Sequence, residues 1–463
     1  MTPNRRAFLV QTAAVTTAFA ALGGTNVAAQ GYAQPNQRYG ALIPDPAGIM
    51  DLPRGFSYTI MSRTGDLMSD GHRTPGAPDG AAAFPAQGLG RDRIIMVRNH
   101  ELKPASTTGP FADVNAAKAF DRALTYDIDE NGAMPGGTTT LVYNTRTRQV
   151  EKSFISLVGT MVNCAGGPTP WGSWLSCEET VSLAADAKGE LDHGWTFEVP
   201  SSATGPVAPT PIKAMGRFKH EAAAVDPRTG VAYQTEDEGD GMIYRFLPTA
   251  QGDLQKGGRL QALAIKGARG ADTRNWETNS FATRTRFDVE WVDLEATHNP
   301  DKDLRLRGRA AGAAIFARGE GMWFGLDEVY FACTSGGRAK QGQIWRYRPS
   351  TREGQSDEAR SPGTLELFIE NNDATQMQNC DNICISPRGL LVIAEDGGGD
   401  NFLRVADRQG RVSALARNAM GNTSPNGSSE LVGCCFSPDG RTMFVSIQTP
   451  GVTLAIHGSF GAG

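Results

Sequence analysis

The sequence predicts an all-β protein of the propeller class, in which groups of strands surround a central axis. Strand patterns recur about every 40 to 60 residues, glycine and proline are abundant at 55 and 26 of 463 residues, and long amphipathic helical patterns are scarce. Turn-rich chains with many short strands are typical of sandwiches, barrels and propellers. Five or six blades are expected, and a twisted β-sandwich pair is the main alternative.

The first 29 residues predict a signal peptide that lies outside the fold. Arg5 and Arg6 precede an apolar, Ala/Thr-rich run, and 27–29 supply the small residues that a signal peptidase requires. Paired arginines predict export by the twin-arginine machinery, with an ordinary secretory signal as the alternative. The run is too short and too rich in threonine and glycine for stable membrane insertion. We therefore expect a periplasmic or secreted bacterial protein.

The charge of the chain argues against nucleic acid as a partner. The formal net charge is −5, and removing the two arginines of the signal peptide brings it near −7. No basic stripe is present that could follow a phosphate backbone. A monomer is expected.

The remaining chain divides into an irregular arm at 30–52 and one β-propeller domain at 53–463. The strand patterns fall at 55–60, 93–98, 138–143, 152–158, 171–176, 221–246, 323–347, 365–369, 381–405 and 430–447. Residues 112–122 predict one short helix. The polar stretches 249–275 and 349–362 predict loops.

Four stretches of the propeller domain share one spacing of polar residues. Each opens on an acidic residue or cysteine and reaches a second polar residue 14 or 15 positions later. The stretches run from Cys164 to Glu178/Glu179, from Glu221 to Glu236, from Asp381 to Glu395, and from Glu320 to Thr334/Ser335. Two apolar runs joined by a turn lie between the ends, so both ends return to one edge of a two-stranded unit.

Repeating this unit around a ring would gather oxygen ligands at one mouth. Clustered carboxylates repel one another unless a cation neutralises them. Calcium accepts several carboxylate and carbonyl oxygens, and glycine-rich loops let backbone carbonyls approach it. The pattern therefore predicts a cation site, although separate solubilising loops would also account for any single acidic pair.

The cysteines differ in their surroundings. Cys164 occupies a position where other units have an acid, and a thiolate there would favour a softer or more Lewis-acidic ion such as iron or zinc. Cys177 could compete for this role, but its strand position also suits a buried structural thiol. Cys333 and Cys384 lie in apolar runs and are expected to be buried. No CxxC or HExxH motif supports a conventional zinc site.

Arg318 lies two residues before Glu320, a spacing that aims both side chains at one face of a strand. A guanidinium beside a cation site would suit a bound anion such as phosphate. A structural salt bridge is the alternative. His100 and His220 precede Glu101 and Glu221, so they point to the opposite face and are expected to be core or supporting residues.

The chain resembles the PhoX-type alkaline phosphatases, which are exported bacterial β-propellers. The resemblance covers most of the mature chain, from 52–56 to 444–451. Its most specific blocks are Arg98-Asn99-His100-Glu101, 163–179, Gly216-Arg217-Phe218-Lys219-His220-Glu221, Asp381-Asn382 and Glu430-Leu431-Val432-Gly433.

The resemblance implies a cluster of Fe³⁺ and Ca²⁺ ions with one cysteine ligand. Cys164 would be that thiolate and Arg318 the phosphate-binding arginine. The other metal ligands would be Glu101, Glu179, Glu221, Glu320, Glu395 and Glu430, and the acidic repeat adds Asp381. Glu178 remains an alternative to Glu179, and Asp396 an alternative to Glu395.

The function implied is hydrolysis of phosphomonoesters, small phosphate esters being the substrates. Two other functions fit the same pattern. One is a calcium-binding propeller that recognises a ligand or partner without catalysis. The other is a propeller hydrolase with a different substrate, similar to a phytase or a lactonase. The family's better-known members are longer, so this chain would be a compact one.

Overall fold

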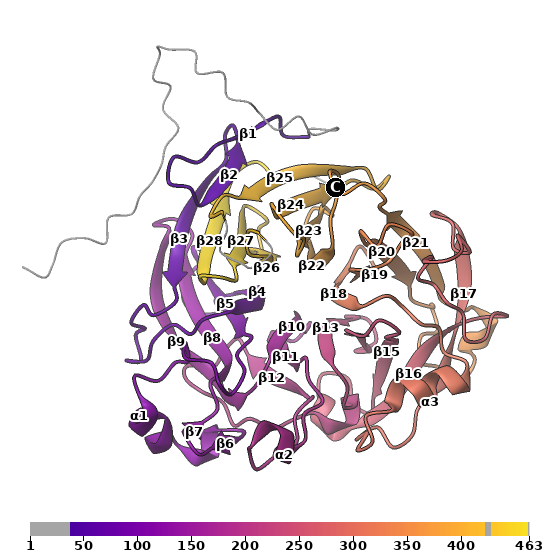
Figure 1. Cartoon of the computed structure of the whole chain (residues 1–463), viewed down its shortest axis with the longest axis horizontal. Helices are drawn as coiled ribbons and strands as arrows, with labels where there is room; N and C mark the ends of the chain where they lie inside the picture. The colour runs from indigo at the N-terminus through magenta and orange to yellow at the C-terminus, as the bar shows by residue number, and fades with distance from the viewer. Residues whose placement is uncertain (1–37, 422–426, 462) are drawn as a thin grey trace, which may run out of the picture.

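The computed structural model describes residues 38–421, 427–461 and 463. Strands dominate the described chain and form a ring of sheets, as the view in Figure 1 shows. The all-β propeller prediction is confirmed, and the alternative of a twisted β-sandwich pair is wrong. The predicted signal peptide at 1–29 lies outside the described residues.

Six successive groups of strands make up the ring. The first three groups are β4 (Pro78–Pro85), β5 (Arg93–His100), β8 (Gly136–Asn144) and β9 (Gln149–Thr160); β10 (Asn163–Pro168), β11 (Ser173–Glu178) and β12 (Thr196–Pro200); and β13 (His220–Val225), β14 (Ala232–Glu236), β15 (Ile243–Pro248) and β16 (Gly258–Ile265). The next two are β18 (Gly319–Gly325), β19 (Glu328–Cys333), β20 (Gln343–Arg348) and β21 (Thr364–Glu370); and β22 (Cys380–Ile385), β23 (Leu391–Glu395), β24 (Phe402–Ala406) and β25 (Val412–Asn418). The last contains β26 (Leu431–Phe436), β27 (Thr442–Ile447), β28 (Val452–His457) and β3 (Ser57–Arg63).

The first strand of each group lies innermost. β4 contacts β10, and the contacts continue through β13, β18, β22 and β26 back to β4. Figure 1 shows these six strands around the centre of the ring. Because both faces of the inner strands are covered by neighbouring groups, their residues are mostly buried; Ala222, Ala223 and Ala224 are each no more than 2% exposed.

The ring is closed by strands from the two halves of the chain. β3 pairs with the C-terminal strand β28, so an N-terminal strand completes the last group. Part of the arm expected to be irregular also forms strands: β1 (Leu42–Ile43) pairs with β2 (Met50–Pro53), and β2 extends the fifth group through β25. β17 (Arg286–Asp293) joins the third and fourth groups by pairing with β16 and β21.

Helices are few and short. The helix predicted at 112–122 is confirmed as α1 (Val114–Ala119), where the Asp113 side chain accepts a hydrogen bond from the Ala116 amide. The other short elements are η1 (Arg122–Leu124), β6 (Ile128–Asp129), β7 (Gly132–Ala133), α2 (Ala184–Ala187), η2 (Lys213–Met215), η3 (Leu254–Lys256), α3 (Leu304–Ala311) and η4 (Glu358–Arg360). None of the described helices is long and apolar enough to cross a membrane. The loop predicted at 249–275 is wrong in part, because it contains the buried strand β16.

Candidate metal centre

Each inner strand carries a β-bulge near its start. On β13, for example, His220 pairs with Glu236 and Ala223 pairs with Gln234, so two residues lie opposite one. A bulge bends the strand and redirects its side chains. The first residue inside the bulge is Asp79 in β4, Cys164 in β10, Glu221 in β13, Glu320 in β18, Asp381 in β22 and Gly433 in β26. Five of these six positions therefore present a carboxylate or a thiol.

A second set of polar residues follows the second strand of each group. Its members are Glu101, Glu179, Asp237, Thr334, Asp396 and Gln448. The backbone amide of each of these residues donates a hydrogen bond to the carbonyl of the residue that precedes the inner strand of the same group. The pairs are Glu101 to Ala77 (2.8 Å), Glu179 to Val162 (2.8 Å), Asp237 to Lys219 (3.2 Å), Thr334 to Arg318 (3.0 Å), Asp396 to Asn379 (3.0 Å) and Gln448 to Glu430 (3.3 Å). One hydrogen bond is thus repeated six times and brings both ends of each two-stranded unit to the same mouth.

The carboxylates and the Cys164 thiol form one continuous arc. The arc consists of four overlapping groups of three residues, and within each group the three ligand atoms lie within 4.8 Å of one another. The groups are Asp79, Glu101 and Cys164; Cys164, Glu179 and Glu221; Glu221, Glu320 and Asp381; and Asp381, Asp396 and Glu430. Neighbouring groups share Cys164, Glu221 and Asp381. Seven of the eight predicted ligands belong to this arc, which we call the acidic arc.

The eighth predicted ligand, Glu395, lies outside the arc. Its carboxylate is buried, accepts a 2.8 Å ion-pair hydrogen bond from Arg404 Nε, and accepts hydrogen bonds from the amides of Gln378 and Phe402. Asp396 belongs to the arc instead. Because side chains alternate along a strand, the last residue of β23 points into the sheet and the next residue points to the mouth.

Asp79 is the arc residue that the sequence analysis missed. It lies in the bulge of β4 and is 1% exposed. A signal for it exists, because an alanine-rich run follows Asp79-Gly80 just as it follows Glu221. Gln448 holds Asp79 in place: its Nε2 donates 2.9 Å hydrogen bonds to Asp79 Oδ2 and to Glu101 Oε2.

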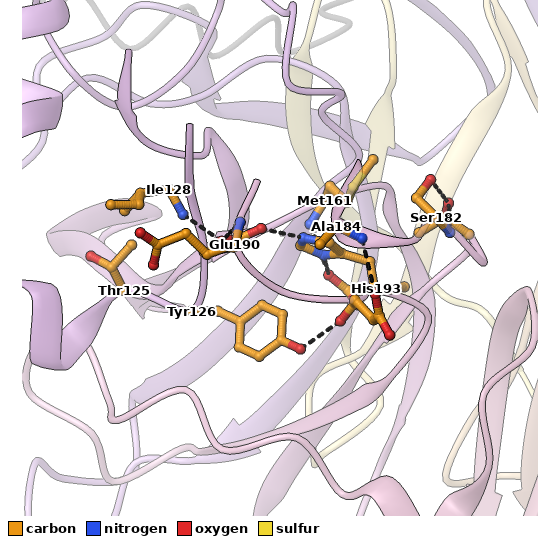
Figure 2. Close-up of polar contacts among 12 residues, drawn as sticks. Thr125, Tyr126, Ile128, Met161, Ser182, Ala184, Glu190 and His193 are labelled. Atoms are coloured by element: carbon orange, nitrogen blue, oxygen red, sulfur yellow. Dashed lines mark hydrogen bonds and ion pairs between the residues drawn. The ribbon is translucent and has the colours of Figure 1, made fainter. Parts of the chain in front are cut away.

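The structure also separates Glu178 from Glu179. Glu178 accepts hydrogen bonds from the amides of Met161 (3.0 Å) and Gly194 (2.8 Å), and one of its oxygens lies 2.6 Å from His193 Nδ1. The other ring nitrogen of His193 lies 3.1 Å from Asp127. Figure 2 shows His193 in this buried network, near Met161 and Tyr126. Glu178 therefore supports the end of β11, and Glu179 reaches the arc.

Burial and mutual repulsion raise the pKa values of the arc carboxyls. Burial is the largest cause for Glu179, whose pKa is about 9, and the charges of Asp237 and Glu101 add to it. The pKa of Asp381 is about 7 for the same reasons, with Asp396 as the main neighbouring charge. The pKa values of Asp79, Glu221, Glu320 and Glu430 are raised well above the usual range. Such a group of carboxylates is stable in its charged form only beside a positive charge.

Cys164 lies at the centre of one half of the arc. Its Sγ is 3.3 Å from Glu221 Oε1, and the Asn99 side-chain Nδ2 donates a hydrogen bond to the Cys164 carbonyl. Burial first, and then the charges of Asp79 and Glu221, raise the pKa of the thiol. Cys177, by contrast, is buried 3.7 Å from Thr196 Oγ1 and does not join the arc. All seven cysteines are free thiols, and Cys333 and Cys384 are buried as predicted.

Arg318 lies at the edge of the arc. Its Nε and Nη2 donate to the two carboxylate oxygens of Asp237, each at 2.8 Å, and Nη2 lies 3.0 Å from Glu320 Oε1. The side chain is 45% exposed, so the guanidinium keeps a solvent-facing part. Burial opposes the charged form, but hydrogen bonding to Asp237 and the charge of Glu320 raise the pKa of Arg318. Arg318 precedes β18 and has a φ of +55°, so it is not part of the strand as predicted, and its ion pair with Glu320 is the salt bridge that the sequence analysis gave as the alternative.

The two histidines that precede arc residues point away from the mouth. His100 contacts the Gly76 carbonyl at 2.9 Å and Thr139 Oγ1 at 2.8 Å. His220 contacts the Gly216 carbonyl at 2.9 Å and stacks on Phe218. Their predicted role as buried supporting residues is confirmed.

The donor set fits cations. Glu221 Oε2 is buried and has no hydrogen-bond partner among the described residues, whereas buried carboxylate oxygens are nearly always paired. Oxygen ligands in this number suit a hard cation such as calcium, and the thiol in their midst suits a softer ion. The donor atoms of the arc therefore include types that suit hard cations and one type that suits softer cations.

One family profile and several solved structures are similar to this chain. Among solved structures, the chain is similar to Pseudomonas fluorescens PhoX in complex with vanadate, described as a transition state analogue, with 19% identity, a TM-score of 0.68, and coverage of 91% of this chain and 98% of that one. Regucalcin of Agrobacterium tumefaciens, described as a calcium-binding protein, is more distant at 12% identity, a TM-score of 0.41, and coverage of 87% and 97%. A search of curated sequences finds no match.

The sequence profile of the family described as "Alkaline phosphatase PhoX" matches residues 37–451. This match spans the whole ring except the last strand and includes every residue of the acidic arc. The chain therefore belongs to the PhoX alkaline phosphatase family, and it is a phosphatase of the hydrolase class.

Proposed function

We propose that this phosphatase is an exported enzyme that hydrolyses phosphomonoesters at a mixed cluster of Fe³⁺ and Ca²⁺ held by the acidic arc. The observation that carries the proposal is the arc itself, in which eight carboxylates and one thiol among the described residues meet at one mouth. A centre with so much negative charge would repel a phosphate ester unless cations filled it.

The division between the two ions rests on Cys164. Thiolates favour iron over calcium, so the groups that contain Cys164 would hold iron with Glu101, Glu179, Glu221 and Asp79 as oxygen ligands. The groups around Asp381, which contain only carboxylates, would hold calcium. Bound cations would supply positive charge for the phosphate oxygens and Lewis-acid activation of the ester and of water.

The residues of the chain would position the substrate around these ions. Arg318 would donate hydrogen bonds from its solvent-facing side to oxygens of the phosphate group. Asp237 would hold the guanidinium plane in a fixed orientation through its two hydrogen bonds. Gln448 would keep Asp79 and Glu101 together, and the His193 network would keep the end of β11 in place so that Glu179 faces the mouth.

Export and oligomeric state belong to the same proposal. The arginine pair Arg5-Arg6 supports passage through the twin-arginine machinery, which transports folded proteins to the periplasm or beyond. A route for folded proteins would suit a centre assembled from all six groups of strands. The enzyme would act as a monomer, because one chain supplies the complete arc.

The test is a metal inventory joined to a phosphatase assay on the purified protein. We expect both iron and calcium, and metal-dependent release of phosphate from p-nitrophenyl phosphate. Cys164→Ala should lose iron, whereas Arg318→Ala should retain the metals and lose turnover. Calcium without iron or activity would favour a non-catalytic calcium-binding propeller. Turnover of phytate or lactones in place of simple phosphomonoesters would favour a different hydrolase.

A further inference from the structure

A cavity lined by arginines lies at the end of the strands opposite the acidic arc. It has a volume of about 690 Å³, and its arginines are Arg91, Arg146, Arg148, Arg388 and Arg441. They come from the turns β4–β5, β8–β9, β22–β23 and β26–β27, whereas the arc lies at the starts of the inner strands. Volumes of about 300–1,000 Å³ are typical of small-molecule sites.

The cavity carries more positive charge than its own acidic residues balance. Asp92 pairs with Arg146 at 3.0 Å, and Asp439 lies 3.9 Å from Arg441. These two carboxylates face five guanidinium groups, so a net positive charge remains in the cavity. The side chains of Arg146 and Arg441 are 71% and 80% exposed, so an anion can reach them from solvent.

The backbone at Arg148 indicates that its position is maintained at a cost. Arg148 has a φ of +58°, in the left-handed region that glycine adopts more easily than any side-chain-bearing residue. A hydrogen bond of 2.7 Å from its amide to the Asn144 carbonyl closes the β8–β9 turn. This left-handed turn places the Arg148 side chain at the cavity.

His457 lies in the same cavity. Burial first, and then the charge of Arg148, lower its pKa to about 4, so the ring is neutral at ordinary pH. Its nitrogens contact Tyr143 at 3.4 Å and Thr442 at 3.5 Å. Both ring nitrogens thus have partners within the protein, and the cavity offers guanidinium donors, which suit the oxygens of phosphate or sulfate groups.

We propose that this arginine-lined cavity is a binding site for a small polyanion that carries two or more phosphate or sulfate groups. Five guanidinium groups from four different turns surround a hollow of ligand size, and a single monoanion would leave part of their charge unbalanced. The site is separate from the acidic arc, and the proposal does not depend on the catalytic function.

The experiment is a calorimetric titration of the metal-loaded protein with two probes that a phosphatase does not consume. Inositol hexasulfate supplies sulfate groups, and methylenediphosphonate supplies phosphonate groups joined by a stable carbon bridge. The variants are Arg148→Gly, Arg388→Gln and, as a charge-matched control on the exposed β2–β3 turn, Arg54→Gln.

We expect at least one probe to bind the wild-type protein, and Arg148→Gly and Arg388→Gln each to weaken it by about tenfold or more, as loss of a charged hydrogen bond does. Arg54→Gln should leave the affinity unchanged, and higher salt should weaken binding. Preference for one probe would identify the source of the anionic groups. Absence of binding, or equal affinity in all four proteins, would overturn the proposal. Arg148→Gly should fold normally, because glycine suits the backbone there, and all variants should retain phosphatase activity.

Discussion

Arg318 and Asp237 are joined by two parallel hydrogen bonds of 2.8 Å between adjacent groups of strands. This bidentate geometry fixes the plane of a guanidinium as well as its position. Asp237 is not one of the residues of the acidic arc, and its carboxylate orients Arg318.

Replacing Asp237 with asparagine should impair substrate binding without removing metal. The amide can accept one hydrogen bond but not two, so the guanidinium would lose its fixed orientation. We expect kcat/KM for p-nitrophenyl phosphate to fall about tenfold, with metal content unchanged. Asp240→Asn is the matched control, because Asp240 pairs with Arg305. Loss of metal in Asp237→Asn would instead identify Asp237 as a ligand.

The neighbours Glu395 and Asp396 should respond differently to the loss of charge. Asp396→Asn should lower the number of bound cations and the activity, because its carboxylate belongs to the arc. Glu395→Gln should keep the metals but lower the free energy of unfolding by about 3 kcal/mol, since it weakens a buried ion pair with Arg404. Metal analysis and urea denaturation of the two variants test this. Metal loss in Glu395→Gln alone would reverse the assignment.

Removing the metals should make stability strongly dependent on pH. The folded-state pKa values of Glu179 (about 9) and Asp381 (about 7) lie above those of unfolded carboxyls. The native metal-free protein therefore binds more protons than the unfolded chain, and its stability should fall as pH rises from about 4 to 9. The metal-loaded protein should show a much weaker fall. Melting temperatures with and without a chelator between pH 5 and 9 measure this difference, and parallel curves would contradict it.

His193 should stabilise the fold in its charged form. Burial lowers its pKa, but Glu178 and Asp127 outweigh burial and raise the pKa to about 9. A folded-state pKa above the unfolded value contributes stability that is complete below about pH 6.5 and is lost as pH rises through 9, and the shift corresponds to about 3 kcal/mol. The His193→Gln variant should be less stable than the wild-type protein at pH 6, and it should lose less stability than the wild-type protein between pH 6.5 and 9. Equal pH dependence of the two proteins would show that His193 is neutral.

The sequence allowed the ring and most of the arc to be predicted, because both follow from local patterns. Glu221 stands directly before an apolar strand run, Asp381 is separated from such a run by one residue, and Cys164 replaces an acid at the corresponding place. The choice between Glu395 and Asp396 stayed open in the sequence, because the alternation of side chains at the end of a strand depends on where the strand ends, and the structure brings Asp396 to the arc. Asp79 was missed because Pro78-Asp79-Gly80 has the composition of a turn.

Long-range pairing could not be predicted in the same way. β3 and β28 are nearly 400 residues apart, and no local pattern indicates that they share a sheet. Strand β16 was hidden in a polar stretch, because its buried part from Leu260 to Ile265 is short. The arginine-lined cavity also depends on distant turns, and its residues are dispersed among ordinary polar segments.

The side-chain amide of Gln448 donates hydrogen bonds to both Asp79 and Glu101, which precede it in the sequence by 369 and 347 positions. A ribosome must therefore finish almost the whole polypeptide before this corner of the centre can exist. In the proposed cluster, the complete set of ions could therefore bind only after the last group of strands has formed, because Glu430 precedes that group. Binding of the complete set of ions would then indicate that all six groups of strands are folded and the ring is closed.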